Sequence, residues 1–139
     1  MVSRNIKKSI EEYLFENIEY FLKNYNIEKI GIAIPGTISK GVIVKSVNLG
    51  IENYNIEEIL KEKFKNIPIV IRNDAKCAAL AESKYGALKE YNRCLFLTLG
   101  TGIGGAVLIN KQLLNTGDLP GCEFGHMIID KDGIPCNCG

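Results

Sequence analysis

The sequence contains no tryptophan, a single histidine and no long apolar run. Its longest stretch without a charged residue, residues 94–110, is shorter than the roughly 20 residues of a membrane helix and includes four glycines. An excess of one charge sign is also missing, since 17 basic and 16 acidic residues give a net charge of +1. Such a chain has no field that attracts a polyanion or an anionic membrane. We therefore expect neither nucleic acid nor a membrane as partner.

A secretory signal is also missing, because Glu11 and Glu12 interrupt the first residues before an apolar segment can form. We therefore expect a cytoplasmic protein, in which the five cysteines are thiols or metal ligands rather than disulfides. Cys77 and Cys94 lie in apolar runs and are expected to be buried free thiols. With 139 residues, of which 46% are hydrophobic, the chain is long enough to bury a core.

Apolar periodicity and turn residues predict alternating helices and strands. Apolar residues at helical spacing predict an amphipathic helix over residues 4–25, and Asn55 is expected to cap a second helix. The predicted strands are "KIGIAIPG", "GVIVKSV" after a turn at residues 39–41, "IPIVIRND" and "RCLFLTLG"; "AKCAALAESKYG" predicts a third helix, ending at Gly86. This alternation predicts an α/β fold with a largely parallel sheet, and the polar residues 88–93 are the expected domain boundary.

The glycine-rich stretch "LGTGIGGAVLINKQ" has the glycine spacing of a dinucleotide-binding fingerprint. That fingerprint needs a helix after the glycines, whereas "AVLIN" and the polar pair Asn110 and Lys111 predict a strand that enters a hairpin. We therefore reject the dinucleotide reading. Two alternatives stay open: a turn whose backbone N–H groups bind an anion beside the Thr101 hydroxyl, and a tight turn without a ligand.

Four segments, in this order and spacing, resemble the ROK family of bacterial sugar kinases and sugar-responsive repressors: "GIAIPGTIS", "IRNDAKCAALAE", "LTLGTGIGGAVL" and "CEFGHMIIDKDGIPCNCG". The resemblance implies an α/β, actin-like ATPase (ribonuclease-H-like) fold that is incomplete in this chain. Residues 1–91 would be a partial N-terminal sugar-kinase domain without its first strands. Residues 92–139 would begin the second domain, with the phosphate loop and a zinc-site segment.

The resemblance also implies the roles of individual residues. Asp74 falls on the catalytic base, and a carboxylate at the end of a strand can accept the proton of a sugar hydroxyl that attacks ATP. The other reading, that Asn73 and Asp74 cap a helix starting at Ala75, is compatible with it. The residues matched to sugar ligands are Gly36, Thr37, Asn73, Asp74, Glu123 and His126, and those matched to the ATP phosphate loop are Gly100, Thr101 and Gly102.

In the family the histidine of "GH" and three cysteines hold a structural zinc ion. His126, Cys136 and Cys138 match three of these ligands, and the fourth would lie beyond Gly139. Cys122 stands where the family has a small residue, so its thiol is a poor substitute. The resemblance therefore implies a zinc site that is incomplete in this chain.

Two family motifs are missing from this sequence: an Asp-x-Gly-Gly-Thr phosphate motif before the first helix and a Gly-Cys-x-Glu ending after the last cysteine. We therefore expect a fragment, cut at both ends and inactive alone, of a kinase that uses ATP and Mg²⁺ to phosphorylate a hexose or N-acetylhexosamine hydroxyl. We also expect that the full-length protein can form a homodimer. The alternatives are the sugar-sensing domain of a ROK repressor and a remnant without activity.

Overall fold

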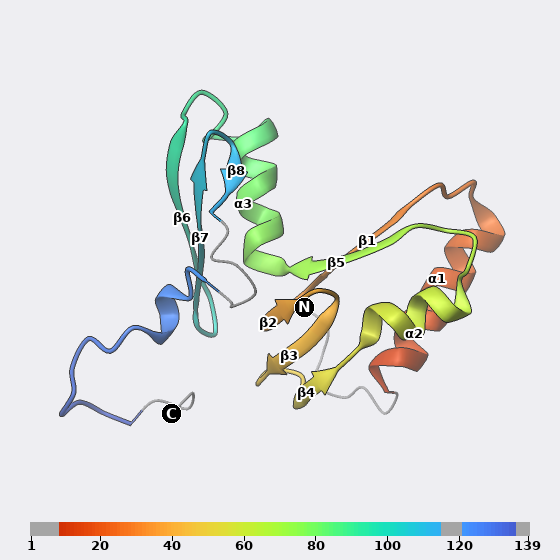
Figure 1. The fold of residues 1–139 in the computed structure, drawn as a ribbon, viewed down its shortest axis with the longest axis horizontal. Coiled ribbons are helices and arrows are strands. Elements are labelled where there is room, and N and C mark those ends of the chain that lie inside the picture. The colour runs from red at the N-terminus through yellow and green to blue at the C-terminus, as the bar shows by residue number, and fades with distance from the viewer. Residues whose placement is uncertain (1–8, 115–120, 136–139) are drawn as a thin grey trace.

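The computed structural model describes residues 9–114 and 121–135. The helices are α1 (Ile10–Asn24), α2 (Ile56–Lys63), α3 (Asp74–Tyr85) and the 3-10 turn η1 (Phe124–His126). The strands are β1 (Ile30–Ile34), β2 (Thr37–Ser39), β3 (Val42–Ser46), β4 (Ile51–Tyr54), β5 (Ile69–Asn73), β6 (Arg93–Leu99), β7 (Ile103–Ile109) and β8 (Gln112–Leu113) (Figure 1). Within the described ranges, every helix is too short or too polar to cross a membrane.

The strands form three small sheets. Strands β1 and β5 pair in parallel, whereas β2–β3–β4 and β6–β7–β8 are antiparallel sheets of three strands each. The prediction of a largely parallel sheet is therefore wrong for the described residues, where β1–β5 is the parallel pair. The physical reason is the length of the connections, because a tight turn can join only antiparallel neighbours.

Tight turns form where the sequence predicted them. Lys40 and Gly41 join β2 to β3 with φ angles of 47° and 82°, and Asn110 and Lys111 join β7 to β8 with φ angles of 51° and 64°. Two successive residues with positive φ are typical of the turns whose twist matches that of a hairpin. The first arm of the β2–β3 hairpin is β2, while the preceding run "KIGIAIPG" forms β1 and pairs with β5.

Side-chain caps define where the first two helices begin. Helix α1 starts after Ser9, whose hydroxyl accepts from the Glu12 N–H (3.2 Å) while the Glu12 carboxylate accepts from the Ser9 N–H (3.0 Å). This is a capping box. Asn55 caps α2 as predicted, with its Oδ1 accepting from the Glu58 N–H at 3.3 Å. The first residues of the helix predicted over 4–25 lie outside the described part of the chain.

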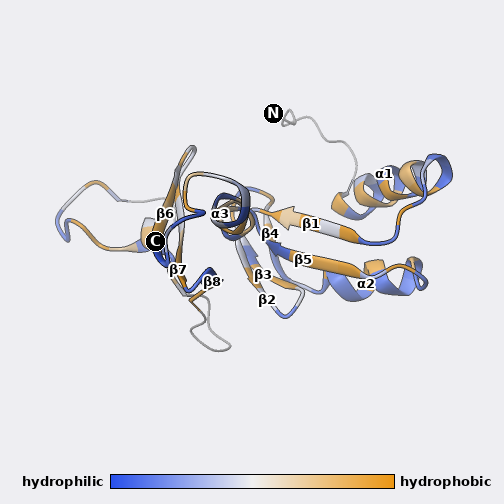
Figure 2. Ribbon diagram, turned by 90° about the horizontal axis from the view of Figure 1, so that it is seen from above, coloured by the Kyte–Doolittle hydropathy of each residue, from blue (hydrophilic) through white to orange (hydrophobic). Residues whose placement is uncertain are grey.

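A first hydrophobic core joins α1 and α2 to β1, β3 and β5. Buried members come from each of these elements: Ile18, Ile34, Ile43, Ile56, Leu60, Phe64, Ile69 and Ile71. Phe15 of α1 meets Phe64 edge to face, with ring centroids 5.9 Å apart. Figure 2 shows α1 beside β1 and α2 beside β5, with apolar residues along both strands. Apolar burial of this extent is the main stabilising contribution to the pair β1–β5 and its helices.

A second core holds α3 against the β6–β7–β8 sheet. Ala79 of α3 is fully buried with Ala106 and Leu108 of β7 and with Cys94 of β6. Cys94 is thus a buried free thiol, as predicted, whereas Cys77, for which burial was also predicted, is only half-buried. Helix α3 also contacts β1 and β5, so it connects the two cores (Figure 1). The domain boundary at residues 88–93, just after this helix, remains a proposal.

The other face of strand β6 is apolar and exposed. Leu95, Leu97 and Leu99 alternate with inward-facing residues, and Ile103 of β7 lies opposite Leu99. Alternation along a strand places these three leucines on one side of the sheet. Leu95, Leu97 and Leu99 therefore form an exposed apolar row on this face.

Candidate functional site

Asn73 occupies the junction of β5 and α3 and links it to a distant turn. As the N-cap of α3, its Oδ1 accepts from the Lys76 N–H at 3.0 Å. Its Nδ2 donates to the Gly36 carbonyl at 2.9 Å and to Asp74 Oδ1 at 3.1 Å. One amide therefore caps the helix and also ties the β1–β2 turn to the helix start.

Gly36 and Thr37 form that turn, and the backbone leaves no alternative to glycine at the first position. Gly36 has a φ of +115°, and an added Cβ would lie 2.5 Å from the Lys45 carbonyl oxygen. Thr37 is half-buried and begins β2, where the pairing with β3 is irregular directly after it. Three of the predicted sugar residues, Gly36, Thr37 and Asn73, thus lie together at the start of α3.

Asp74 is the first residue of α3, one position earlier than the predicted start at Ala75. Its carboxylate is exposed, and its Oδ1 accepts from the Ala75 N–H at 2.8 Å and from the Asn73 amide. Among the described residues both hydrogen bonds end on Oδ1, which leaves Oδ2 available to a ligand. A carboxylate at a helix N-terminus is also favoured by the helix dipole.

Cys77 lies one turn further along α3 than Asp74. Burial raises the pKa of the Cys77 thiol, the Arg72 guanidinium opposes this rise, and the Asp74 carboxylate adds to it. The thiol is therefore a poor nucleophile at neutral pH, because the thiolate is the reactive form. We assign Cys77 no role in the chemistry of the site.

The glycine turn between β6 and β7 lies close to the same helix end. Its residues Gly100, Thr101 and Gly102 are exposed, and the Gly100 N–H donates to the Gly102 carbonyl at 3.0 Å. A strand follows the turn rather than a helix, which confirms the rejection of the dinucleotide fingerprint. A Cβ added at Gly104, near the start of β7, would lie 3.1 Å from the Ala75 side chain, so β7 contacts the first turn of α3.

The chain itself does not demand glycine at Gly100 or Gly102. A Cβ added at either residue would meet no heavy atom within 4 Å, and neither residue has a left-handed φ. An approaching ligand is one reason to keep such positions bare, because glycine lets a phosphate reach the backbone. Phosphate binding at this turn remains a prediction.

Glu123 comes directly before the 3-10 turn η1, which rests on β7 and ends at His126. A Cβ added at Gly125 would lie 2.0 Å from the Ile103 carbonyl oxygen, so only glycine fits this contact. Glu123 is half-buried, and its Oε1 lies 3.7 Å from the Lys76 ammonium of α3. His126 is exposed at the end of η1. The structure therefore places the Glu123 carboxylate next to Lys76, in the first turn of α3.

The predicted zinc ligands fall partly outside the described residues. Cys136 and Cys138 belong to the part of the chain that the structure does not describe. Across residues 9–114 and 121–135, no group of three His, Cys, Asp or Glu side chains could hold a metal ion. The zinc site remains a prediction, which the donor types fit because one imidazole and two thiolates suit zinc.

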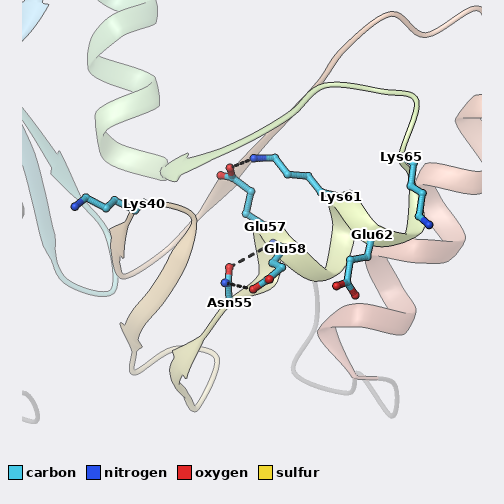
Figure 3. Close-up of a pocket in the computed structure, with 7 residues that line it drawn as sticks. All are labelled: Lys40, Asn55, Glu57, Glu58, Lys61, Glu62 and Lys65. Carbon is cyan, nitrogen blue, oxygen red and sulfur yellow. Dashed lines mark hydrogen bonds and ion pairs between the residues drawn. The ribbon is translucent and has the colours of Figure 1, made fainter.

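Two features of the surface escaped the sequence reading. Lys76 was not singled out, although its ammonium pairs with the Glu123 carboxylate. A pocket on α2 also went unforeseen, with mixed-charge walls made by Lys40, Asn55, Glu57, Glu58, Lys61, Glu62 and Lys65 (Figure 3). None of the predicted site residues lines it, and the Glu57–Lys61 ion pair across it already joins opposite charges. We therefore place the candidate site at the start of α3.

Comparisons with known proteins show what the chain is similar to. The sequence model of the ROK family matches residues 2–139. The chain is 33% identical to the xylose repressor of Bacillus spizizenii over 141 residues, covering 97% of this chain and 36% of the repressor. It is 38% identical to the glucokinase of Halalkalibacterium halodurans over 113 residues, covering 79% of this chain and 34% of that enzyme.

Among solved structures, the chain is similar to a ROK family glucokinase from Streptomyces griseus in complex with glucose and AMPPNP. The TM-score is 0.83 at 26% identity, covering 94% of this chain and 42% of that chain. This likeness confirms the predicted α/β fold of the actin-like ATPase class. The chain spans less than half the length of each of these three relatives, and they include both enzymes and a repressor.

Proposed function

Because this chain belongs to the ROK family, we propose that it supplies the sugar-binding part of an ATP-dependent sugar kinase. The substrate is a hexose or an N-acetylhexosamine, and the reaction transfers the γ-phosphoryl group of ATP to one of its hydroxyls. The observation that carries the proposal is the Asp74 carboxylate, whose Oδ1 is fixed by two hydrogen bonds while Oδ2 is available. The activity is proposed for the whole protein, since the chain spans only part of its relatives' length.

In this proposal the residues at the start of α3 divide the work. Asn73, Glu123 and the Gly36–Thr37 turn bind sugar hydroxyls and fix the orientation of the ring. Asp74 accepts the proton of the attacking hydroxyl at Oδ2, within hydrogen-bond reach of a sugar held by Asn73. The β6–β7 glycine turn contacts the phosphates of ATP, which with Mg²⁺ provides the transferable group. Holding both reactants in line is the larger part of such catalysis.

The test is a comparison of Asp74→Asn with wild type in the whole protein. Asparagine keeps the shape and can still accept the Ala75 N–H, but it cannot take up the proton. We expect sugar binding to persist and kcat to fall by about 10²- to 10⁴-fold. Asp132→Asn is the matched control, because Asp132 is exposed and its carboxylate pairs with the neighbouring Lys131. Unchanged turnover of Asp74→Asn would show that this carboxylate does no more than bond the helix end.

A second function, sugar sensing by a repressor, is supported by the xylose repressor, whose match covers 97% of this chain. A sensor would use the same sugar ligands without transferring phosphate. ADP release measured with ATP and a panel of sugars distinguishes the two. Sugar binding by calorimetry without any sugar-dependent ADP release would favour the sensor and reject the kinase.

We also propose that His126, Cys136 and Cys138 bind a structural zinc ion. Both thiols must lose their protons to bind zinc, so affinity should fall as pH drops. A competition titration with a chromophoric chelator, at pH 8 and pH 6, measures this directly. The variant Cys136→Ser should lose zinc, whereas Cys94→Ser, at a buried thiol in the second core, should keep it. Equal affinity of both variants would contradict the site.

A further inference from the structure

We propose that Lys76 is a positioning residue of the sugar site, which acts through Glu123. Its ammonium holds the Glu123 carboxylate toward the first turn of α3 and so places it beside Asn73 and Asp74. The inference rests on the proposed sugar-binding role of Glu123. It adds a residue that neither the sequence reading nor the comparisons assign to the site.

The position of Lys76 on α3 is fixed by its own backbone. Its N–H donates to the capping Asn73 side chain at 3.0 Å, so the residue stands in the first turn of α3, two positions after Asp74. Its ammonium lies 3.7 Å from Glu123 Oε1. Of the ion pairs between described residues, this one joins α3 to the segment 121–126. The contact therefore connects two parts of the candidate site that are 47 residues apart in sequence (123 − 76).

Partial burial distinguishes this pair from an ordinary surface pair. The side chains of Lys76 and Glu123 are 23% and 31% exposed. Those of the ion pair between the sequence neighbours Lys131 and Asp132 are 85% and 82% exposed. Charges shielded from solvent interact more strongly, and salt screens them less. The Lys76–Glu123 attraction should therefore hold a side chain in place, while the exposed pair contributes almost nothing.

The backbone around Glu123 leaves the direction of its side chain undetermined. Packing of Gly125 on the Ile103 carbonyl fixes the turn η1 on β7, and Cys122 takes a left-handed φ of 63° just before it. Glu123 is the N-cap residue of η1, but its carboxylate makes no capping hydrogen bond there. Among the described residues, Lys76 is thus the group that can direct this carboxylate. Removing the ammonium should loosen Glu123 and with it the hydrogen bond that its backbone carbonyl accepts from the His126 N–H.

The experiment measures the segment and the sugar separately, in the full 139-residue chain. Lys76→Met keeps the length of the side chain and removes the charge, and Lys76→Arg restores a cation. Lys61→Met is the matched control, because Lys61 also pairs with a glutamate, on α2, away from the site. The first readout is the NMR spectrum, in which His126 gives the only imidazole signals of the chain and its amide reports on the bond to the Glu123 carbonyl. The second is the Kd of glucose and of N-acetylglucosamine by calorimetry.

We expect Lys76→Met to speed exchange of the His126 amide and to weaken sugar binding, each by about 2- to 5-fold, as loss of one ion pair predicts. Lys76→Arg should restore most of the wild-type exchange rate and sugar affinity, and Lys61→Met should change neither quantity. In a Glu123→Gln background, Lys76→Met should cause no further loss, because the two residues act as a unit.

Two results would overturn the proposal. One is unchanged exchange of the His126 amide in Lys76→Met. The other is a loss of sugar affinity on Lys76→Met that is equally large in the wild-type and Glu123→Gln backgrounds. If the wild-type chain binds neither sugar, the proposed function fails for this chain. The His126 exchange rates of these variants then still decide whether Lys76 positions Glu123, because they need no ligand. The two failures are therefore distinguishable.

Discussion

Substitutions of Asn73 should separate the contributions to stability of the two hydrogen bonds that hold the start of α3. Asn73→Ala removes the cap on the Lys76 N–H, which costs about 1 kcal/mol, and the donor to the Gly36 carbonyl, which costs about 1 kcal/mol more. Asn73→Ser keeps a hydroxyl that can cap the helix but is too short to reach Gly36. We therefore expect losses in the free energy of unfolding of about 2 kcal/mol for alanine and about 1 kcal/mol for serine.

Urea denaturation followed by far-UV circular dichroism measures these losses. If the free energy of unfolding falls with urea concentration at the same slope in all three proteins, the unfolding transition is unchanged. The expected order of stability is wild type, then serine, then alanine. If serine matches wild type, the bond to Gly36 contributes nothing and the turn is held by its backbone alone. If serine is as unstable as alanine, the cap contributes nothing. Either result would refute the corresponding half of the argument.

Three further predictions concern single side chains. Gly36→Ala should lower the free energy of unfolding by at least about 3 kcal/mol in the same assay, since it combines a positive φ with a clash against the Lys45 carbonyl. Ser46→Ala should leave stability unchanged or raise it by up to about 1 kcal/mol, because the Ser46 hydroxyl is 1% exposed and unpartnered among the described residues. Cys77 should react with iodoacetamide more slowly than a free cysteine at pH 8, since burial raises its pKa, and a rate equal to that of the free amino acid would contradict this.

Local signals in the sequence predicted the elements that local interactions form. Asn55 was identified as a helix cap, and Asn110 with Lys111 as a turn, because a side chain or a φ preference decides each of them within a few residues. Strand β4 was not predicted, since "IENY" carries a glutamate and an asparagine, both of which are depleted in strands, and Asn53 takes a φ of 51°. Its pairing with β3 is what makes this segment a strand.

The same difference between local and distant contacts decides which parts of the candidate site could be predicted. The junction of Asn73 and Asp74 was predictable because a strand end and a helix start adjoin in sequence. The bond from Asn73 to Gly36 and the pair between Lys76 and Glu123 were not, because each joins residues that are distant in the chain. A lysine in the first turn of a helix is ordinarily a solvated residue, so its sequence position carried no sign of a partner.

Sugar binding alone cannot distinguish the kinase from the sensor, because both functions use the same ligands around Asn73. The difference must lie in groups that act only during phosphoryl transfer, since an interaction made equally with bound sugar and transition state does not raise kcat. Of the residues placed at the start of α3, Asp74 meets this condition, because its Oδ2 is available while Oδ1 already bonds the chain. A kinase therefore depends on the basicity of one oxygen, whereas a sensor tolerates an amide there. Asp74→Asn should lower the first activity by about 10²- to 10⁴-fold and spare the second.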